Sequence, residues 1–264
     1  MEVVIAPADR LARLAADVVE RLVRAGATEG GHAVLGLATG STPLAVYDEL
    51  ARRHVEDGLS FAGVEAFMLD EYVGLAADHP ERYRNVIERE LVARVDLDPA
   101  DVHGPDGLAP DLPAACAAYE AAILEAGGVD VQILGIGTDG HVAFNEPGSS
   151  LASRTRLKTL THGTRVDNAR FFGGDLDAVP LHCLTQGLAT IMQARHLVLL
   201  ATGRGKAEAV HQLVEGPVSA LWPATVLQLH PHVSVLVDDD AACRLQLAGF
   251  YREAYAAKPT WQGL

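Results

Sequence analysis

Three acid–base side chains stand close together near the middle of the chain, in the stretch 138–147 (TDGHVAFNEP). They are Asp139, His141 and Glu146, all within eight residues. A histidine held by carboxylates can accept and return a proton near neutral pH, because its ordinary pKa is about 6.5. The spacing therefore indicates proton-transfer chemistry with His141 as the working group. A simpler interpretation is a surface ion-pair cluster, since purely structural networks also contain such residues.

The stretch that must position these residues is 131–137 (VQILGIG). It has the length and β-branched content of a strand buried on both faces, as parallel strands covered by helices usually are. Its glycines then end the strand. In an open α/β sheet, ligands bind outside the carboxyl ends of the strands. We therefore expect the three acid–base residues at the mouth of such a sheet.

Residues 135–140 (GIGTDG) also fit the G-x-G-x-x-G fingerprint of dinucleotide-binding sites. That motif requires a helix to begin at once and an unencumbered turn against the pyrophosphate. Asp139 would repel this anion, and Pro147 with Gly148 leaves too little room for the helix. The sequence therefore argues against a nicotinamide or flavin site.

The stretch GIGTDGHVAFNEP closely resembles the signature of the glucosamine-6-phosphate deaminases. In that family the Asp, His and Glu at these spacings open the sugar ring, so the resemblance implies that Asp139 and Glu146 orient His141. A second stretch, FMLDEYVGL at 67–75, is similar to another signature of the family. The resemblance implies that Asp70, its first aspartate, removes the proton from C2. Position alone would also allow Asp70 simply to cap the loop after a strand.

Composition limits the class of protein. The 264 residues, 49% of them hydrophobic, are enough for one large α/β domain with a well-buried sheet. A net charge of −14 argues against nucleic acid or an anionic membrane as partner. Cys116, Cys183 and Cys243 show no metal-ligand spacing, so no metal is expected. No apolar run approaches about 20 residues and no export signal is visible, so we expect a cytoplasmic protein.

The rest of the chain alternates strand and helix patterns, which is typical of a Rossmann-like α/β fold. We expect an open, mostly parallel sheet with helices on both faces, formed by 1–264 as a single domain. Strands are expected at 3–6, 32–38, 64–69, 131–137, 196–201 and 233–237. Helices are expected at 9–25, 44–54, 79–95, 114–126, 184–194 and 206–214, with a loop at 98–113 and a final helix that 238–240 cap and that ends near 257.

Two turns of small residues follow expected strands. Gly40, Ser41 and Thr42 offer free amides and two hydroxyls at a helix N-terminus, with Thr42 as the expected N-cap. Residues 202–206 repeat this arrangement and add a cation, Lys206. The first turn could be only a good helix start, and Lys206 only a solvated lysine. In the family that the chain resembles, this pair of turns holds the substrate phosphate.

Residues 151–180 are unusually rich in positive charge for so acidic a chain and show no clean helical or strand period. Such a segment is either a functional lid or disordered, and its Leu, Val and Phe content favours a lid. A lid would keep water away from a reactive intermediate. The resemblance implies that Arg170, within this segment, also binds the substrate phosphate.

Some members of the resembled family are hexamers activated by N-acetylglucosamine 6-phosphate. The activator site matches four residues here: Ser149, Arg156, Lys158 and Thr159. A tyrosine completes that site, but Tyr251 here is about one residue out of register and Arg252 stands in its place. The residues alone would be only lid or surface. We therefore expect a homo-oligomer, hexameric if the activator site works.

The resemblance implies conversion of glucosamine 6-phosphate and water to fructose 6-phosphate and ammonia, without a metal or organic cofactor. Sugar-phosphate isomerases and 6-phosphogluconolactonase would share a phosphate site, but we expect them to lack the paired DEYVGL and GHVAFNEP stretches. A sugar-phosphate-sensing regulator would normally carry a DNA-binding helix-turn-helix and a basic surface, and this chain has neither.

Overall fold

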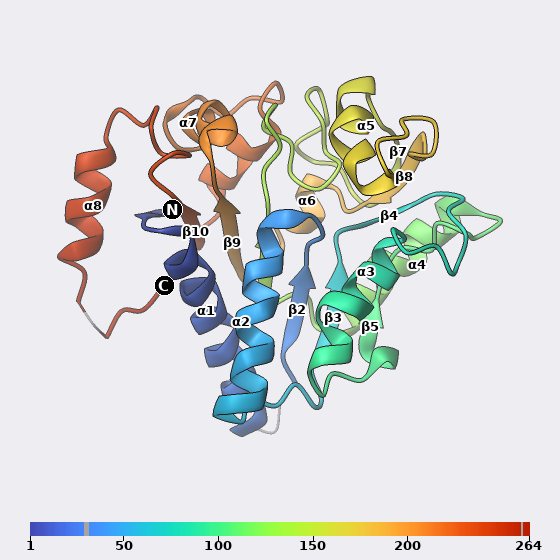
Figure 1. Cartoon of the computed structure of the whole chain (residues 1–264), viewed down its shortest axis with the longest axis horizontal. Helices are drawn as coiled ribbons and strands as arrows, with labels where there is room; N and C mark the ends of the chain where they lie inside the picture. Colours follow the sequence, from blue (N-terminus) through green and yellow to red (C-terminus); the bar gives the residue numbers. More distant parts are fainter. Residues whose placement is uncertain (29–31, 260) are drawn as a thin grey trace.

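A seven-stranded parallel sheet forms the centre of the molecule (Figure 1). The structure is a computed structural model that describes residues 1–28, 32–259 and 261–264. The sheet has the order β1-β10-β9-β6-β2-β3-β5, with all of these pairings parallel. Its strands are β1 (Glu2–Ile5), β2 (Val34–Leu37), β3 (Glu65–Met68), β5 (Val102–His103), β6 (Val131–Leu134), β9 (His196–Ala201) and β10 (Val233–Val237). The predicted α/β fold is confirmed.

The order of the strands reverses between β2 and β6. From β2 the chain adds β3 and β5 on one side, then returns to place β6 on the other side of β2 and adds β9 and β10 beyond it. In open α/β sheets, ligands bind at such a switch point, outside the carboxyl ends of the strands. The turns that follow β2 and β6 are therefore where a site is expected.

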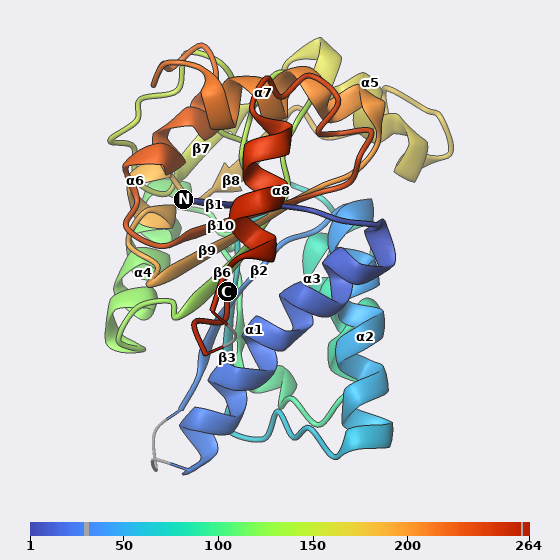
Figure 2. The ribbon, with the colours of Figure 1, turned by 90° about the vertical axis from the view of Figure 1, so that its left-hand side faces the viewer.

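Helices cover both faces of the sheet, as Figure 2 shows. α1 (Ala8–Thr28) packs beside α2 (Ser41–Asp57) on one face, and α4 (Leu112–Glu125) lies on the other with α6 (Leu188–Ile191). The other helices are α3 (Tyr83–Glu90), α5 (His162–Ala169), α7 (Ala207–Glu215) and α8 (Ala248–Ala256), with 3-10 turns η1 (Val92–Arg94), η2 (Pro99–Asp101), η3 (Arg170–Phe172), η4 (Arg204–Lys206) and η5 (Pro223–Leu229). Within the described ranges, no helix has the length and apolar character needed to cross a membrane.

A second, antiparallel sheet lies beyond the carboxyl ends of the main strands (Figure 1). In it β4 (Asp70–Tyr72) pairs with β8 (His182–Thr185), and β8 pairs with β7 (Arg156–Thr159). The prediction of a helix over 184–194 was wrong at its start, because residues 182–185 (HCLT) form β8 and α6 covers only 188–191. The pattern of so short a stretch does not distinguish a buried strand from the first turn of a buried helix. Residues 151–180, whose sequence shows no clean helical or strand period, contain β7 and α5.

Several helix boundaries differ from the predictions. The helix expected over 79–95 is limited to α3, because Arg82 before it has an extended backbone with ψ of 126°. α4 begins earlier than expected, because the side chain of Asp111 caps it by accepting the amide of Ala114 at 2.9 Å. The predicted loop therefore ends early, and it contains β5. Asp238 accepts the amide of Ala241 at 2.7 Å, but the turn that it caps is not continued and α8 begins only at 248.

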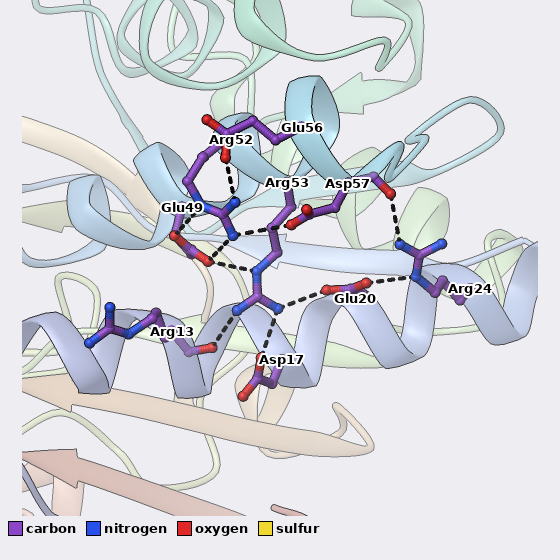
Figure 3. A network of polar contacts seen from close by, with 9 residues as sticks. All are labelled: Arg13, Asp17, Glu20, Arg24, Glu49, Arg52, Arg53, Glu56 and Asp57. Carbon is purple, nitrogen blue, oxygen red and sulfur yellow. Dashed lines mark hydrogen bonds and ion pairs between the residues drawn. The ribbon is translucent and has the colours of Figure 1, made fainter.

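A buried guanidinium joins α1 to α2 (Figure 3). The side chain of Arg53 contacts the carboxylates of Asp17, Glu20 and Glu49 at 2.7–2.8 Å. It also donates to the backbone carbonyl of Arg13 at 3.1 Å. A charge can be buried only when it is paired and hydrogen-bonded, and these partners supply both. The network therefore fixes α2, whose N-terminus follows β2 at the switch point, against α1.

Candidate active site

A cleft of about 530 Å³ opens at the switch point, outside the ends of β2, β6 and β9 and beside β4. Its wall includes most of the predicted catalytic and phosphate-binding residues: Gly40, Ser41, Thr42, Asp70, His141, Arg170 and Lys206. These residues are distant in sequence, so only the assembled sheet brings them together. Asp139 and Glu146 are not part of the wall and stand behind His141 in the same loop.

The turn after β2 offers backbone amides to the cleft. Gly40 has a φ of 103°, a conformation that L side chains rarely adopt, and α2 begins directly after it at Ser41. The prediction that Thr42 is the N-cap was therefore wrong, because the conformation of Gly40 starts the helix two residues earlier. No described side chain caps this helix. Uncapped amides at the positive end of a helix form an anion site.

The turn after β9 places a cation on the same wall. The amide of Gly203, whose φ is 83°, donates to both carboxylate oxygens of Asp238 at 3.0 Å, which fixes the turn. Lys206 follows, and burial lowers its pKa. Arg170 approaches from η3 with its guanidinium 4.7 Å from the ring centre of Phe171. Two cations beside a helix N-terminus suit a phosphate group.

Asp70 is a buried carboxyl group on the cleft wall, with 6% of its surface exposed. Burial raises the pKa of Asp70 well above its ordinary value, and the neighbouring carboxylate of Glu71 raises it further. A carboxylate with a raised pKa is a stronger base once it has lost its proton. The position and environment of Asp70 therefore suit a general base.

His141 is paired with Asp139. Its Nδ1 lies 2.7 Å from Oδ1 of Asp139, and the same oxygen accepts the backbone amide of His141 at 3.2 Å. The ring contact does not have the geometry of a hydrogen bond, and it becomes an ion pair when His141 is protonated. Burial alone would raise the pKa of Asp139, but its contacts with His141 lower it overall. A histidine oriented in this way can exchange protons at the cleft.

Glu146 is 4% exposed and makes its described contacts elsewhere. Its Oε1 accepts from the hydroxyls of Thr161 and Thr164 and from the amide of Thr161. The described hydrogen bonds and ion pairs of His141 do not include Glu146, so the part of Glu146 in orienting His141 stays a prediction. Its observed contacts connect the His141 loop to the start of α5.

The loop from His141 to Glu146 is held tightly. Among the described non-glycine residues, Ala143 has a positive φ, 52°, and such strain is often found at functional sites. The side-chain amide of Asn145 donates to the carbonyls of Val142 at 3.0 Å and Gln186 at 2.8 Å. The loop is thereby joined to the end of β8, which pairs with the strand of Asp70. Within the described residues, no group of three or more His, Cys, Asp or Glu side chains is placed to hold a metal ion.

Comparison with known proteins gives the family. The model described as "Glucosamine-6-phosphate isomerases/6-phosphogluconolactonase" matches residues 6–236. The chain belongs to this family. The resemblance seen in the two signature stretches is thus confirmed.

Members of this family named glucosamine-6-phosphate deaminase match the full chain. Those of Mycolicibacterium smegmatis and Beutenbergia cavernae are 70% and 71% identical over 265 residues, which cover 100% of each chain. A solved structure described as a monomeric glucosamine-6-phosphate deaminase has a TM-score of 0.88 and 40% identity, and covers 92% of this chain and 99% of that one. A 6-phosphogluconolactonase from Trypanosoma cruzi shares the fold, with a TM-score of 0.73, 20% identity and coverage of 93% and 97%.

The predicted activator residues of this isomerase/lactonase family member lie outside the cleft wall. They are Ser149, in a turn, and Arg156, Lys158 and Thr159 on β7. Ser149 is 3% exposed and its hydroxyl has no described partner. The hydroxyl of Tyr251, on α8, contacts Glu215 of α7 at 3.3 Å. Three of the four predicted activator residues thus lie on β7, whereas the hydroxyl of Tyr251 is directed to α7.

Aromatic side chains form one side of the cleft, a feature that was not predicted from the sequence. The ring of Tyr83 lies 4.7 Å from that of Tyr72 and 6.1 Å from that of Phe144, centre to centre. All three residues line the cleft. Tyr83 belongs to the helix expected at 79–95, where it stands among charged side chains in a pattern typical of a solvated helix face. The available signal was an aromatic residue two positions from Asp70, in DEY, and two positions from Glu146, in FNE.

Proposed function

We propose that this chain is a glucosamine-6-phosphate deaminase, which converts glucosamine 6-phosphate and water to fructose 6-phosphate and ammonia in amino-sugar catabolism. The observation that carries the proposal is one cleft that holds a buried, basic Asp70, a paired His141 and an anion-binding wall. Identities of 70% and 71% to proteins of that name, over the full chain, support it.

Substrate binding and ring opening come first. The 6-phosphate binds at the amides and hydroxyls of Gly40, Ser41 and Thr42, with Lys206 and Arg170 supplying positive charge. His141, paired with Asp139 and in a loop that Glu146 connects to α5, transfers a proton from the C1 hydroxyl to the ring oxygen. The pyranose then opens to the aldehyde form of the amino sugar.

Isomerisation and loss of ammonia follow. As Asp70 removes the proton from C2, the aldehyde oxygen takes up a proton from the substrate's ammonium group, which gives the enolamine. Asp70 then returns its proton at C1, which leaves a protonated imine at C2. Water adds to C2, ammonia leaves, and the C2 carbonyl of fructose 6-phosphate remains. Every step is a proton transfer or an addition to a carbon–nitrogen double bond, so positioning and matched pKa values can supply the rate, and the proposal includes no metal or organic cofactor.

Regulation and assembly complete the proposal. N-acetylglucosamine 6-phosphate is the candidate activator, at Ser149 and the β7 residues, in a cytoplasmic homo-oligomer that is hexameric if activation occurs. Residues 151–180, which carry Arg170 onto the cleft wall, are the candidate lid. The solved relative with 40% identity is described as monomeric, so activation and assembly must be tested together.

The test is release of ammonia and fructose 6-phosphate from glucosamine 6-phosphate, over a substrate series, with and without N-acetylglucosamine 6-phosphate. A hyperbolic curve that ignores the N-acetyl sugar indicates a deaminase without activation. A sigmoidal curve that the N-acetyl sugar straightens supports a working activator site. No ammonia would contradict the proposed function, and assays of sugar-phosphate isomerisation and lactone hydrolysis on the same sample would identify the alternative.

A further inference from the structure

Glu71, the residue after Asp70, is a carboxylate buried on the other side of β4. Only 1% of its surface is exposed. Because side chains alternate along a strand, Asp70 and Glu71 point to opposite faces, and Asp70, but not Glu71, lines the cleft. Glu71 therefore does not touch a substrate in the cleft. The mechanism above uses no part of it, which leaves a costly buried charge to be explained.

The side chain of Glu71 is held by three backbone amides. Its Oε1 accepts from the amides of Tyr72 at 2.8 Å and Tyr83 at 3.0 Å, and its Oε2 accepts from that of Arg84 at 2.9 Å. Nε of Arg82 lies 3.7 Å from Oε2. Because all three partners are N–H donors, these bonds favour the ionised form of Glu71. Burial raises the pKa of Glu71, and the three amides and Arg82 oppose that effect.

Two of these amides are the first of α3. The helix begins at Tyr83, and the residue before it, Arg82, makes no side-chain cap. The first four amides of a helix need partners, and an anion is favoured there by the helix dipole. Glu71 thus caps α3 from a neighbouring strand. It thereby fixes Tyr83, whose ring stacks within 10° of parallel on Phe144, from the His141 loop.

The carboxylate of Glu71 also acts electrostatically on Asp70. Besides burial, the carboxylate of Glu71 is the described influence that raises the pKa of Asp70. Four other titratable groups interact with Asp70, namely Tyr72, Tyr83, Tyr119 and Cys183, and burial raises the pKa of each, so that they are neutral near pH 7. The remaining titratable side chains on the cleft wall are His141, Lys206, Arg170, Asp167, Glu81, Arg89 and Glu90.

We propose that Glu71 is a positioning residue for the proton transfer. Anchored in the first turn of α3, it keeps a fixed negative charge directly behind Asp70 and holds Tyr83 in the cleft wall. The charge makes Asp70 a stronger base towards the weakly acidic C2 proton, and the anchor keeps the aromatic side of the cleft in place. The inference rests on the proposed deaminase activity.

The test is the pH dependence of kcat/KM for ammonia release by Glu71→Gln. Without the negative charge the pKa of Asp70 falls, so the acid limb of the profile moves to lower pH, by roughly one unit for a charge this close. The weaker base lowers kcat roughly three- to tenfold at the optimum, with little change in KM. A purely structural role would scale the profile down without moving its limb.

Two further variants isolate the charge. Arg82→Gln leaves both the cap and the carboxylate of Glu71 in place and removes only the cation beside it, and Arg82 is not among the described influences on Asp70, so the acid limb of this variant stays near that of the wild type. Glu88→Gln makes the same chemical change as Glu71→Gln near the C-terminal end of the helix that Glu71 caps, and leaves the limb where it is. If Glu71→Gln does not fold, Glu71→Asp, which keeps the negative charge, should keep the wild-type limb. A limb moved to lower pH in Glu71→Asp, or limbs that coincide in wild type and a folded Glu71→Gln, would overturn the proposal. Absence of ammonia release by the wild type would instead overturn the function on which it rests.

Discussion

A Cβ atom added to Gly137 would lie 2.2 Å from Cε1 of His141. The imidazole therefore lies directly over the backbone of the turn that ends the β6 region. The amide of Gly137 also donates to the carbonyl of His141 at 2.8 Å, which closes the turn. Glycine at 137 is thus a condition for the 2.7 Å contact between His141 and Asp139.

Gly137→Ala is expected to inactivate the site while the fold survives. The methyl group forces the ring of His141 away from Asp139, and loss of a placed acid–base group typically costs about 10²-fold or more in kcat/KM. Ammonia release measures the loss, and circular dichroism with thermal unfolding checks the fold. Gly249→Ala is the matched control, because a Cβ there meets nothing within 4 Å. Near-normal turnover of Gly137→Ala would show that His141 needs no fixed position.

Asp70→Asn is expected to abolish turnover and leave substrate binding intact. An amide of the same shape cannot accept the C2 proton, so kcat should fall by about 10²–10⁴-fold. Calorimetry should show glucosamine 6-phosphate bound with an affinity near the wild-type KM. Burial raises the pKa of Asp70, so this carboxyl group takes up its proton at a higher pH than an ordinary aspartate does. Wild-type activity should therefore disappear, on acidification, at a pH above the usual pKa range of aspartate. A variant with near-normal activity would exclude Asp70 as the base.

Lys206→Met should act mainly on KM. The lysine is on the cleft wall, and a charged contact to phosphate that is equal in ground and transition states lowers KM without changing kcat. A rise in KM of about tenfold or more is expected, together with weaker inhibition by inorganic phosphate. Arg204→Met, two residues earlier, is the control, because Arg204 is not on that wall. Equal effects of the two substitutions would mean that substrate binding depends only on the total positive charge near the cleft and not on a contact with Lys206.

Arg53→Met should destabilise the protein. Its side chain is 8% exposed, whereas the side chains of Asp17 and Glu20 keep more contact with solvent, so we expect a loss of about 2–3 kcal/mol, below the usual cost of breaking a fully buried pair. Urea unfolding measures it. Arg13→Met removes an exposed ion pair with Asp9 and should cost less than about 0.5 kcal/mol. If the two variants unfolded alike, the network in Figure 3 would contribute nothing beyond surface charge.

Stability should fall in mild acid because of a histidine pair. His196 and His232 stack with ring centres 3.5 Å apart, and burial, with the effect of His232, lowers the pKa of His196 to about 3. The unfolded chain protonates His196 near pH 6.5, so between about 6.5 and 3 it binds more protons than the native state. The free energy of unfolding therefore decreases as the pH falls through this window, by at most about 1.4 kcal/mol per unit from this residue. Urea unfolding of His196→Gln across the window should show a smaller slope; an unchanged slope would assign the effect elsewhere.

The sequence was sufficient for six of the seven strands of the main sheet, all but β5, and for the cleft residues at its edge. Runs such as 131–137 and 196–201 are mostly apolar, and the polar residues that follow them meet because parallel strands end at one edge. The contacts of Glu146 could not be predicted from the sequence. Thr161 and Thr164 lie 15 and 18 residues away in sequence, and no local pattern indicates that α5 returns to this loop.

The small sheet and the aromatic side of the cleft were missed for a related reason. On β7 the apolar Leu157 is exposed and Arg156 is half-buried. A prediction from hydrophobic periodicity assumes the reverse, with the apolar side chain buried and the charged one exposed. Tyr83 stands beside charged residues that indicated a solvated face, yet its ring reaches into the cleft. Glu71 follows Asp70 in a signature stretch, and only the pairing of β4 shows that the two carboxylates face opposite ways.

The clamp between Asp238 and Gly203 has a consequence for biosynthesis. The turn that presents Lys206 is fixed by a carboxylate at the end of β10, the last strand of the chain to be made. A nascent chain that already contains Asp70, His141 and Lys206 therefore still lacks a set phosphate site. Catalytic activity should appear only after residue 238 has left the ribosome. Truncated chains that end before Asp238 should therefore be inactive rather than partly active.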